Sequence, residues 1–275
     1  MKRTIEVKNY TKSYGDKKAV DQVSFTIEEG SITGFIGKNG AGKTTTIRAM
    51  MNFIKPDEGN ITIAGFDVIK EAVKVHELVG YMPGDCTFYP SLIGLDVLKM
   101  YASIANVEMS ELQKLATYFE LDLSKKTSQL SLGNRKKLSI IQALAQPKEI
   151  FILDEPTNGL DPYMQKKFFD LLISYKQEGK TIFLSSHNLA DVEKYCDRAL
   201  IIRDGKLLED VALKDRKKLG YYILYQTMDD KYHTITSKKA IHEILAELQQ
   251  LELQDIEIRK ATIEDEFIKY FKEDE

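Results

Sequence analysis

The sequence predicts an α/β protein with a mostly parallel central sheet and a small α+β segment at its carboxyl end. Short, continuously apolar runs typical of buried strands alternate with amphipathic helices along most of the chain. A glycine-rich loop joins one such run directly to a helix, and the alternation restarts after about residue 215. A chain of 275 residues is long enough for one large domain and an appendage. We therefore expect a main domain over 1–215 and an accessory α+β domain over 216–275.

Composition excludes several classes of protein. The hydrophobic share of 43% and charged share of 29% are those of an ordinary soluble domain. A net charge of -3 gives no basic field for nucleic acid, so no nucleic-acid partner is expected. The two cysteines are far apart and indicate a reduced compartment without disulfides. No apolar run approaches the ~18 residues that cross a bilayer, so a membrane role would require a partner protein.

The amino-terminal part contains strands of alternating pattern, one buried strand and one helix. In chain order these are strands 4–14, 19–30 and 31–37, helix 43–54 and strand 61–65. From 91 to 146 the pattern becomes helical and predicts a helical subdomain, with helices at 95–107, 111–121 and from near 134 to before 147. The rest of the main domain is predicted as strand 149–153, helix 165–179, strand 181–186 and a hairpin over 198–210.

The carboxyl-terminal segment is predicted as a hairpin, a helix, a strand and a closing helix. The hairpin covers 221–237, the helix 240–251 and the strand 255–259. Thr262 and Asp265 are spaced like a capping box at the start of the closing helix.

The stretch "GKNGAGKTT" matches the phosphate-binding pattern G-x-x-x-x-G-K-[ST]. A loop that wraps a phosphate turns its N–H groups inward, which needs backbone angles that glycine adopts at low cost. The following helix directs its positive end at the same oxygens, Lys43 adds a charge, and Thr44 offers a hydroxyl to Mg²⁺. The alternative is a plain glycine-rich turn. The nucleotide-binding residues predicted here are Gly37, Lys38, Asn39, Gly40, Ala41, Gly42, Lys43, Thr44 and Thr45.

Two adjacent carboxylates follow the apolar run "EIFIL". Asp154, where the run ends, is predicted to hold Mg²⁺, and Glu155 is predicted to polarise the attacking water as a general base. The alternative is a pair of surface acids at a strand end. His187 follows the strand "TIFLSS". We expect this strand beside the strand that enters the glycine loop, so a hydrogen bond from His187 to the γ-phosphate is predicted. Together with Lys43, Glu155 and His187 form the predicted catalytic set.

The order of these motifs resembles the ATP-binding-cassette (ABC) family over about residues 5–210. "LSLGN" at 130–134 is similar to the family signature, and "NGLDP" at 158–162 is similar to its D-loop, with Asp161. His187 resembles the switch histidine. Tyr14 matches the aromatic residue that stacks on adenine, although it equally fits a surface tyrosine in a turn. The resemblance implies a P-loop NTPase fold of ABC type, with an amino-terminal antiparallel β subdomain and a helical subdomain.

The resemblance also implies a mechanism that needs two chains. Two cassettes would face each other head to tail, with ATP and Mg²⁺ as cofactors. Ser131 and the N–H of Gly133 would cap the ATP held by the loop of the other cassette, whether that is a second copy or a related subunit. Hydrolysis would release the pair and drive a separate membrane permease, which would hold this chain at the cytoplasmic face of the membrane.

Two departures from the family pattern stand out. Leu132 and Asn134 replace a Gly and the Gln of the usual signature LSGGQ, while Ser131 is kept. Gly84 stands where members carry a Gln or Glu that contacts Mg²⁺ or the attacking water. Asp85, the next residue, is the predicted substitute metal ligand.

Three function classes compete on the sequence. The first is the ATPase subunit of a transporter, with export favoured by the short appendage and the resemblance to subunits of bacterial drug, peptide or lipid exporters. Its permease is expected to dock near Phe88, Tyr89 and Leu92, which equally fit core packing. The second is a soluble ABC ATPase that acts on ribosomes or DNA. The third is a module that closes on ATP without hydrolysing it.

Overall fold

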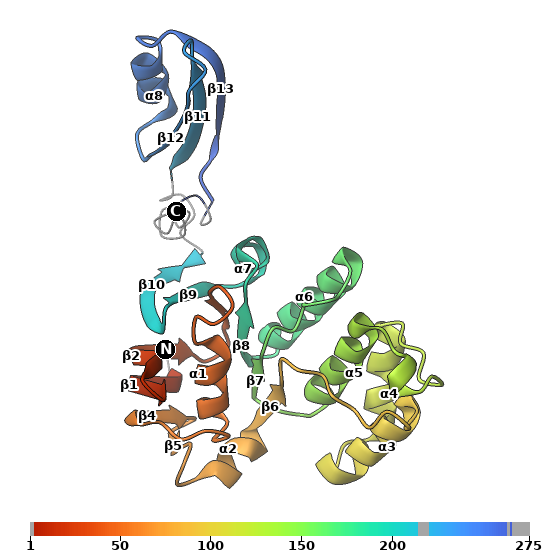
Figure 1. Ribbon diagram of the computed structural model, residues 1–275. Helices are drawn as coiled ribbons and strands as arrows, with labels where there is room; N and C mark the ends of the chain where they lie inside the picture. The colour runs from red at the N-terminus through yellow and green to blue at the C-terminus, as the bar shows by residue number, and fades with distance from the viewer. Residues whose placement is uncertain (1–2, 214–219, 263–264, 266–275) are drawn as a thin grey trace. The chain divides into compact units, whose positions relative to one another are not determined.

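The computed structural model describes residues 3–213, 220–262 and 265 (Figure 1). The chain forms two compact units: Met1–Asn188 with Tyr195–Val211, and Leu189–Lys194 with Ala212–Glu275. The first unit carries two sheets, and the second carries one.

The amino-terminal sheet of the first unit has four strands in the order β2-β1-β4-β5. Strand β1 (Arg3–Tyr14) pairs antiparallel with β2 (Lys17–Glu28) and with β4 (Glu58–Ile63), and β5 is Phe66–Asp67. Residues of β2 alternate between buried and exposed because one face of the sheet packs on the core. This is the predicted antiparallel β subdomain.

The central sheet has six strands in the order β10-β9-β3-β8-β7-β6. The strands are β3 (Ile32–Ile36), β6 (Val79–Met82), β7 (Ile150–Leu153), β8 (Thr181–Ser186), β9 (Arg198–Arg203) and β10 (Lys206–Ala212). The neighbours from β9 through β3, β8 and β7 to β6 pair in parallel. Strands β3, β7 and β8 are buried along their whole length, as continuous apolar runs predict.

Parallel pairing decides where the functional loops lie. Ile36 at the end of β3 is paired with Ser186 at the end of β8, and Leu153 at the end of β7 is paired with Leu184. Because parallel strands end at the same edge, the loops that follow β3, β7 and β8 meet there. Three aromatic rings, Phe25, Phe35 and Phe183, pack with ring centres 5.5 to 5.8 Å apart and join the two sheets behind this edge.

Helices cover the central sheet and form a separate helical group (Figure 1). The helices of the first unit are α1 (Lys43–Met50), α2 (Ala72–Leu78), α3 (Gly94–Ala105), α4 (Met109–Tyr118), α5 (Leu132–Leu144) and α6 (Pro162–Gln177), with a 3₁₀ turn at Thr127–Gln129. A further helix, α7 (Leu189–Tyr195), follows β8. Helices α3, α4 and α5 match the three helices predicted for 91–146.

Two local predictions need correction. The first helix ends at Met50 and not near residue 54, because Asn52 adopts a left-handed backbone with φ 54 that stops the helical path. Helices α2 and α7 and strands β5 and β6 were not predicted. Helix α2 buries only Val75, so it leaves no apolar period in the sequence, and β6 is four residues long.

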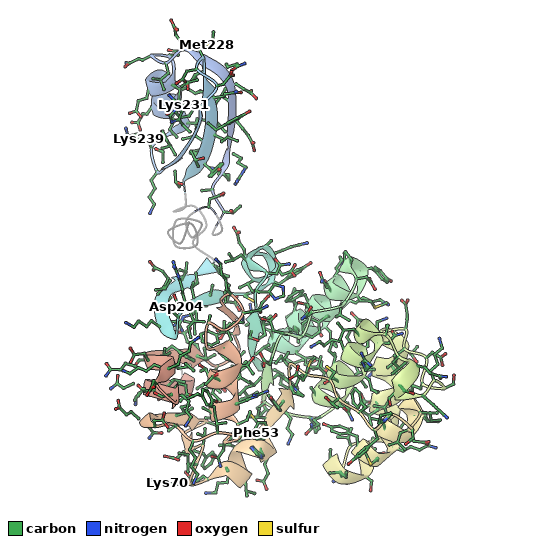
Figure 2. All side chains as sticks on the ribbon, viewed as in Figure 1. Phe53, Lys70, Asp204, Met228, Lys231 and Lys239 are labelled. Carbon is green, nitrogen blue, oxygen red and sulfur yellow. The ribbon has the colours of Figure 1, made fainter. Side chains whose placement is uncertain are left out.

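The second unit has a three-stranded antiparallel sheet in the order β12-β11-β13. Its elements are β11 (Tyr221–Thr227), β12 (Tyr232–Ser237), α8 (Ile241–Leu248) and β13 (Leu253–Lys260). Ile223 and Tyr225 of the sheet pack on Ile244 and Leu248 of α8, and Met228 and Lys231 belong to the β11–β12 turn (Figure 2). The predicted closing helix lies outside the described residues, apart from Thr262 and Asp265.

Candidate active site

The glycine loop connects β3 to α1 and packs against the central sheet. Gly42 precedes α1 with φ 108, a backbone angle that side chains other than glycine's disfavour. A Cβ added at Gly37 would lie 2.4 Å from the backbone oxygen of Ile202 in β9, so only glycine allows this approach. Lys38, Asn39 and Gly40 form the exposed crest of the loop, whereas Ala41, Gly42 and Lys43 are buried.

The amine of Lys43 lies inside the loop. Its Nζ donates hydrogen bonds to the carbonyl oxygens of Gly37 (2.6 Å) and Lys38 (3.3 Å) and lies 3.1 Å from Oε1 of Glu155 as an ion pair. Thr44 and Thr45 stand in the first turn of α1, where the positive end of the helix dipole also points at the loop. The loop, the lysine and the helix end form one site for anionic oxygens.

Asp154 follows β7 and is 1% exposed. Its Oδ1 accepts a hydrogen bond from the hydroxyl of Ser185 (2.6 Å), but its Oδ2 is buried and accepts none from the described residues. A buried carboxylate oxygen without a donor is uncommon and fits a metal ligand. Among the described residues no cluster of three or more His, Cys, Asp or Glu could hold a metal by itself.

Glu155 is held in an uncommon conformation. Its φ of 46 is left-handed, which costs free energy for a side chain of this size. Its N–H donates to the hydroxyl of Ser185 (2.8 Å), and its Oε2 lies 2.8 Å from Nδ1 of His187, which is 55% exposed. Its Oε1 is buried, forms the ion pair with Lys43 and accepts no hydrogen bond from the described residues. Each carboxylate oxygen therefore has one charged or polar neighbour. The structure thus brings together the three residues that the sequence predicted to be catalytic.

Ser185 was missed by sequence reasoning. Its hydroxyl donates to Asp154 and accepts from the N–H of Glu155, so one side chain positions both carboxylate residues. The available signal was a pair of serines at the end of the apolar run "TIFLSS". A hydroxyl in a buried strand needs hydrogen-bond partners, and these lie just after the end of the adjacent strand β7.

The signature-like residues lie at the start of α5. Ser131 caps the helix, its Oγ accepting from the N–H of Asn134 at 3.2 Å. A Cβ added at Gly133 would lie 2.6 Å from the backbone oxygen of Gly159, so this turn touches the turn that precedes α6. Asp161 caps α6 through a hydrogen bond from the N–H of Met164 (3.0 Å). Ser131 and Asp161 make no hydrogen bond with residues 37–45 within the part of the chain described.

Tyr14 and Asp85 are both exposed. Tyr14 ends β1 and is 53% exposed, with the amine of Lys12 lying 5.9 Å from the centre of its ring. Adenine binding there stays a prediction. Asp85 is 91% exposed, and its carboxylate lies 3.9 Å from the guanidinium of Arg48. The backbone of Gly84, not Asp85, adjoins Asp154: a Cβ added at Gly84 would be 3.1 Å from Asp154 Oδ2.

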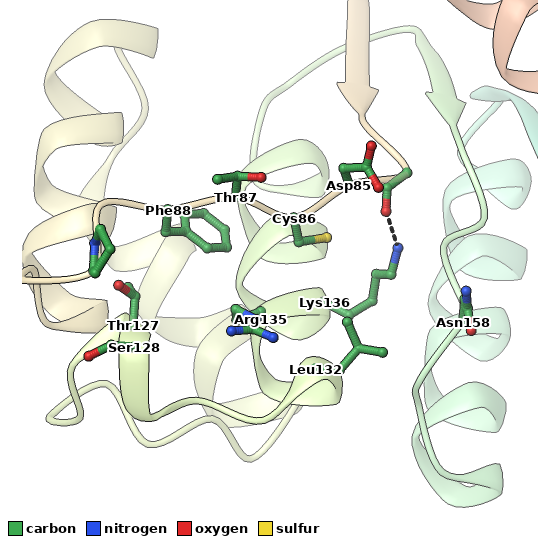
Figure 3. Close-up of a pocket in the computed structure, with 12 residues that line it drawn as sticks. Asp85, Cys86, Thr87, Phe88, Thr127, Ser128, Leu132, Arg135, Lys136 and Asn158 are labelled. Atoms are coloured by element: carbon green, nitrogen blue, oxygen red, sulfur yellow. Dashed lines mark hydrogen bonds between the residues drawn. The ribbon is translucent and has the colours of Figure 1, made fainter.

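A groove of about 710 Å³ opens between the loop after β6 and the start of α5 (Figure 3). Its cationic lining residues are Arg135 and Lys136, and Phe88 is its aromatic one. Of the three residues predicted to dock a permease, Phe88 lines the groove, whereas Tyr89 and Leu92 are not among its lining residues. The full lining set is Gly84, Asp85, Cys86, Thr87, Phe88, Pro90, Thr127, Ser128, Leu132, Arg135, Lys136 and Asn158.

The fold and the phosphate loop define a P-loop ATPase. Residues 20–158 match the family model described as ABC transporter, and the chain belongs to this family as an ATP-binding subunit with ATPase activity. ABC transporter ATP-binding protein MJ1023 of Methanocaldococcus jannaschii is 36% identical, covering 82% of this chain and 84% of the relative. Bacitracin transport ATP-binding protein BcrA of Bacillus licheniformis is 35% identical, covering 96% and 84%.

Two further comparisons bear on function and fold. Nod factor export ATP-binding protein I of Sinorhizobium fredii is 35% identical, covering 74% of this chain and 61% of that protein. A solved ATP-binding subunit of an ABC transporter has a TM-score of 0.70 at 29% identity, covering 78% of this chain and 92% of that chain. A dimeric, post-hydrolysis cassette, MJ0796 bound to ADP and Pi, has a TM-score of 0.69 at 24% identity, covering 76% and 98%, and shows the shared fold.

Proposed function

We propose that this ATPase powers export through a separate membrane permease, by ATP-driven pairing of two cassettes. Transport is supported by the relative named for bacitracin transport, and the outward direction by the relative named for Nod factor export. Within the described residues no helix is long and apolar enough to cross a membrane. The chain would work at the cytoplasmic face of the membrane through the permease, and residues 1–215 and 216–275 would be its ATPase and accessory domains.

The observation that carries the hydrolytic part is the fixation of Glu155 between Lys43 (3.1 Å) and His187 (2.8 Å). Lys43 and the loop N–H groups would hold the outer phosphates, and Glu155 would accept the proton of the attacking water. His187 would orient Glu155 and contact the γ-phosphate. Mg²⁺, held by Asp154 Oδ2 and the hydroxyl of Thr44, would neutralise charge on the phosphates.

Pairing of two cassettes would complete each site. Ser131 and Gly133 stand at the amino-terminal end of α5, which suits an anion presented from outside the chain. Asp161 lies in the turn that Gly133 touches through Gly159, so both would face the partner. The partner would be a second copy or a related ATPase, with Tyr14 stacked on adenine in each chain.

The groove beside α5 would receive a cytoplasmic segment of the permease. It is lined by the aromatic Phe88 and by the loop that reaches Asp154 through Gly84, so an occupant could influence the metal side of the site. Replacing Phe88 with Asp should uncouple ATP hydrolysis from transport while nucleotide binding is retained. Loss of nucleotide binding or of folding would instead assign Phe88 to core packing.

The test of hydrolysis is Glu155→Gln, which removes the base but keeps the shape of the side chain. We expect the ATPase rate to fall about 10²–10⁴-fold and an ATP-bound dimer to accumulate on size exclusion. Glu149→Gln is the control, because Glu149 is an exposed acid just before β7, the strand that Glu155 follows. Its carboxylate oxygen Oε1 lies 2.9 Å from the amine of Lys180. Equal rates in wild type and Glu155→Gln would contradict the assignment. A wild type without ATP turnover would indicate a non-hydrolytic module.

Co-purification tests the partner. A tagged chain recovered from detergent extract should bring an integral membrane protein with it, and the Phe88→Asp variant should recover less of it. Recovery of ribosomes or DNA would favour the soluble class of ABC ATPase and overturn the proposal of a permease.

A further inference from the structure

Lys136 is a buried lysine that the proposed reaction does not use. It lies about one and a half turns after Ser131 on α5 and is only 2% exposed. Its Nζ donates a hydrogen bond of 2.9 Å to the carbonyl oxygen of Gly84 across the groove, drawn as a dashed line in Figure 3. Lysine is almost never fully buried unless its charge is paired or hydrogen-bonded. This contact therefore accounts for the burial and ties the loop after β6 to α5.

The Gly84 peptide, which accepts the hydrogen bond from Lys136, lies next to the predicted metal ligand Asp154. A Cβ added at Gly84 would lie 3.1 Å from Oδ2 of Asp154, the oxygen that accepts no hydrogen bond from the described residues. Gly84 has no side chain, so only its backbone can act there. A carbonyl oxygen turned toward Oδ2 would repel the carboxylate or compete with it for a cation. The ammonium of Lys136 holds this oxygen on the α5 side.

We propose that Lys136 is a positioning residue that fixes the Gly84 peptide beside Asp154 and so links α5 to the metal side of the chain's own ATP site. The inference rests on the proposed metal role of Asp154. Helix α5 begins at Ser131 and Gly133, which would serve the ATP of the partner chain. A shift of α5 when it contacts the partner's ATP would therefore be transmitted, through the hydrogen bond from Lys136 to Gly84, to the ATP site of its own chain.

The experiment compares Lys136→Met with Lys136→Arg and with Lys137→Met. Lys137 is also largely buried on α5, but its amine is not among the buried polar atoms and makes no hydrogen bond or ion pair with any described residue. It is therefore the control for the loss of a lysine from this helix. Amide hydrogen exchange of the segment 83–88, in which residue 83 is a proline and the amides of 84–88 report, is measured without nucleotide. The kcat, the KM for ATP and the half-saturating Mg²⁺ concentration are measured with nucleotide.

We expect Lys136→Met to speed exchange at 83–88 but not at 37–45. It should lower kcat about tenfold and raise the half-saturating Mg²⁺ concentration several-fold, with KM for ATP changed less than about twofold. Lys136→Arg should restore most of kcat, because it keeps a charged donor at this position. Lys137→Met should leave the exchange at 83–88 and the Mg²⁺ requirement unchanged.

Two results would overturn the proposal. One is a Lys136→Met variant with a lower melting temperature but wild-type exchange at 83–88 and wild-type kcat, which assigns the lysine to packing alone. The other is an equal effect of Lys137→Met, which indicates a general loss of charge. If the wild-type chain hydrolyses no ATP, the proposed function fails, and the exchange measurement still decides whether Lys136 holds Gly84.

Discussion

At the scale of single residues, the site depends on side chains that position other side chains. Glu155 adopts a left-handed backbone, which is unfavourable for its residue type, and is held there by Ser185, Lys43 and His187. Ser185 also holds Asp154 so that one carboxylate oxygen has a donor and the other has none. The two carboxylates are adjacent in sequence but differ in environment, which suits one for a metal and the other for a proton.

Ser185→Ala tests this positioning. The substitution removes one hydrogen bond from each carboxylate residue, and bonds to charged groups contribute about 1.5–3 kcal/mol. We therefore expect kcat to fall roughly 10- to 100-fold, with ATP affinity little changed. Steady-state ATPase kinetics provide the measurement. Ser186→Ala is the control, because that hydroxyl accepts from the N–H of Asn188 at 2.9 Å and not from the carboxylate residues. Equal kcat values in both variants would remove Ser185 from the mechanism.

At the scale of secondary structure, the parallel pairing of β3, β8 and β7 brings the loops together. The start of α5 meets the turn that precedes α6. Gly133 in the first turn of α5 approaches the backbone oxygen of Gly159 so closely that a methyl group would lie 2.6 Å from it. The surface predicted to receive the partner's ATP is therefore built from two helix starts whose spacing depends on one glycine.

Gly133→Ala should separate these helix starts. Because the obstructing atom belongs to the backbone, α5 or the Gly159 turn has to move. We expect ATP-dependent pairing in the Glu155→Gln background to be lost, while each chain still binds ATP. Light scattering with and without ATP measures the pairing. Leu132→Ala, which shortens a neighbouring exposed side chain, should still pair. Normal pairing of Gly133→Ala would show that this turn is not part of the dimer surface.

At the scale of the whole molecule, the chain divides into two units with separate cores. The second unit is held at its carboxyl end by Asp265, whose carboxylate accepts hydrogen bonds from the guanidinium of Arg259 at 2.5 and 2.7 Å. Asp265 also accepts from the N–H of Thr262 (2.7 Å), and its own N–H donates to the Thr262 hydroxyl (3.2 Å), as in a capping box. The sequence-predicted pairing of Thr262 with Asp265 is thus confirmed.

The pKa of Asp265 indicates the pH range over which its carboxylate stabilises the second unit. Burial alone would raise the pKa, but hydrogen bonds from Arg259 and Thr262 outweigh burial and lower it below the ordinary value. A lowered pKa stabilises the folded state above the unfolded pKa of about 4. This stability is lost as pH falls through the folded pKa. We expect the second unit to weaken on acidification below about pH 4, as followed by circular dichroism.

Asp265→Ala should destabilise the second unit by about 2–3 kcal/mol, because it removes the carboxylate that accepts hydrogen bonds from both Arg259 and Thr262. Differential scanning calorimetry with and without ATP separates the two units: we expect the transition that ATP does not shift to move to lower temperature. Glu257→Gln removes an exposed partner of the same arginine, 3.6 Å away, and should change stability by less than about 1 kcal/mol. ATPase activity that falls in step with this transition would contradict the independence of the two units.

The sequence determined the features that are written in adjacent residues. The glycine loop, the Asp154–Glu155 pair and most helices and strands follow from local backbone preference and from apolar periods of two or about 3.6 residues. These were sufficient for the fold class and for the residues predicted to hold ATP. Helix α2 and strand β6 were not predicted, because α2 has a single buried residue and β6 is only four residues long.

Only the tertiary structure decided the contacts between residues far apart in the chain. Ser185 with Asp154, Gly133 with Gly159 and Lys136 with Gly84 each join separate loops or elements. The physical reason is that periodicity specifies which face of an element is buried, whereas strand order and helix packing specify which residues meet across it. The nucleotide loop is a local property of this chain, and the links that align its two carboxylates and its signature helix are properties of the packed fold.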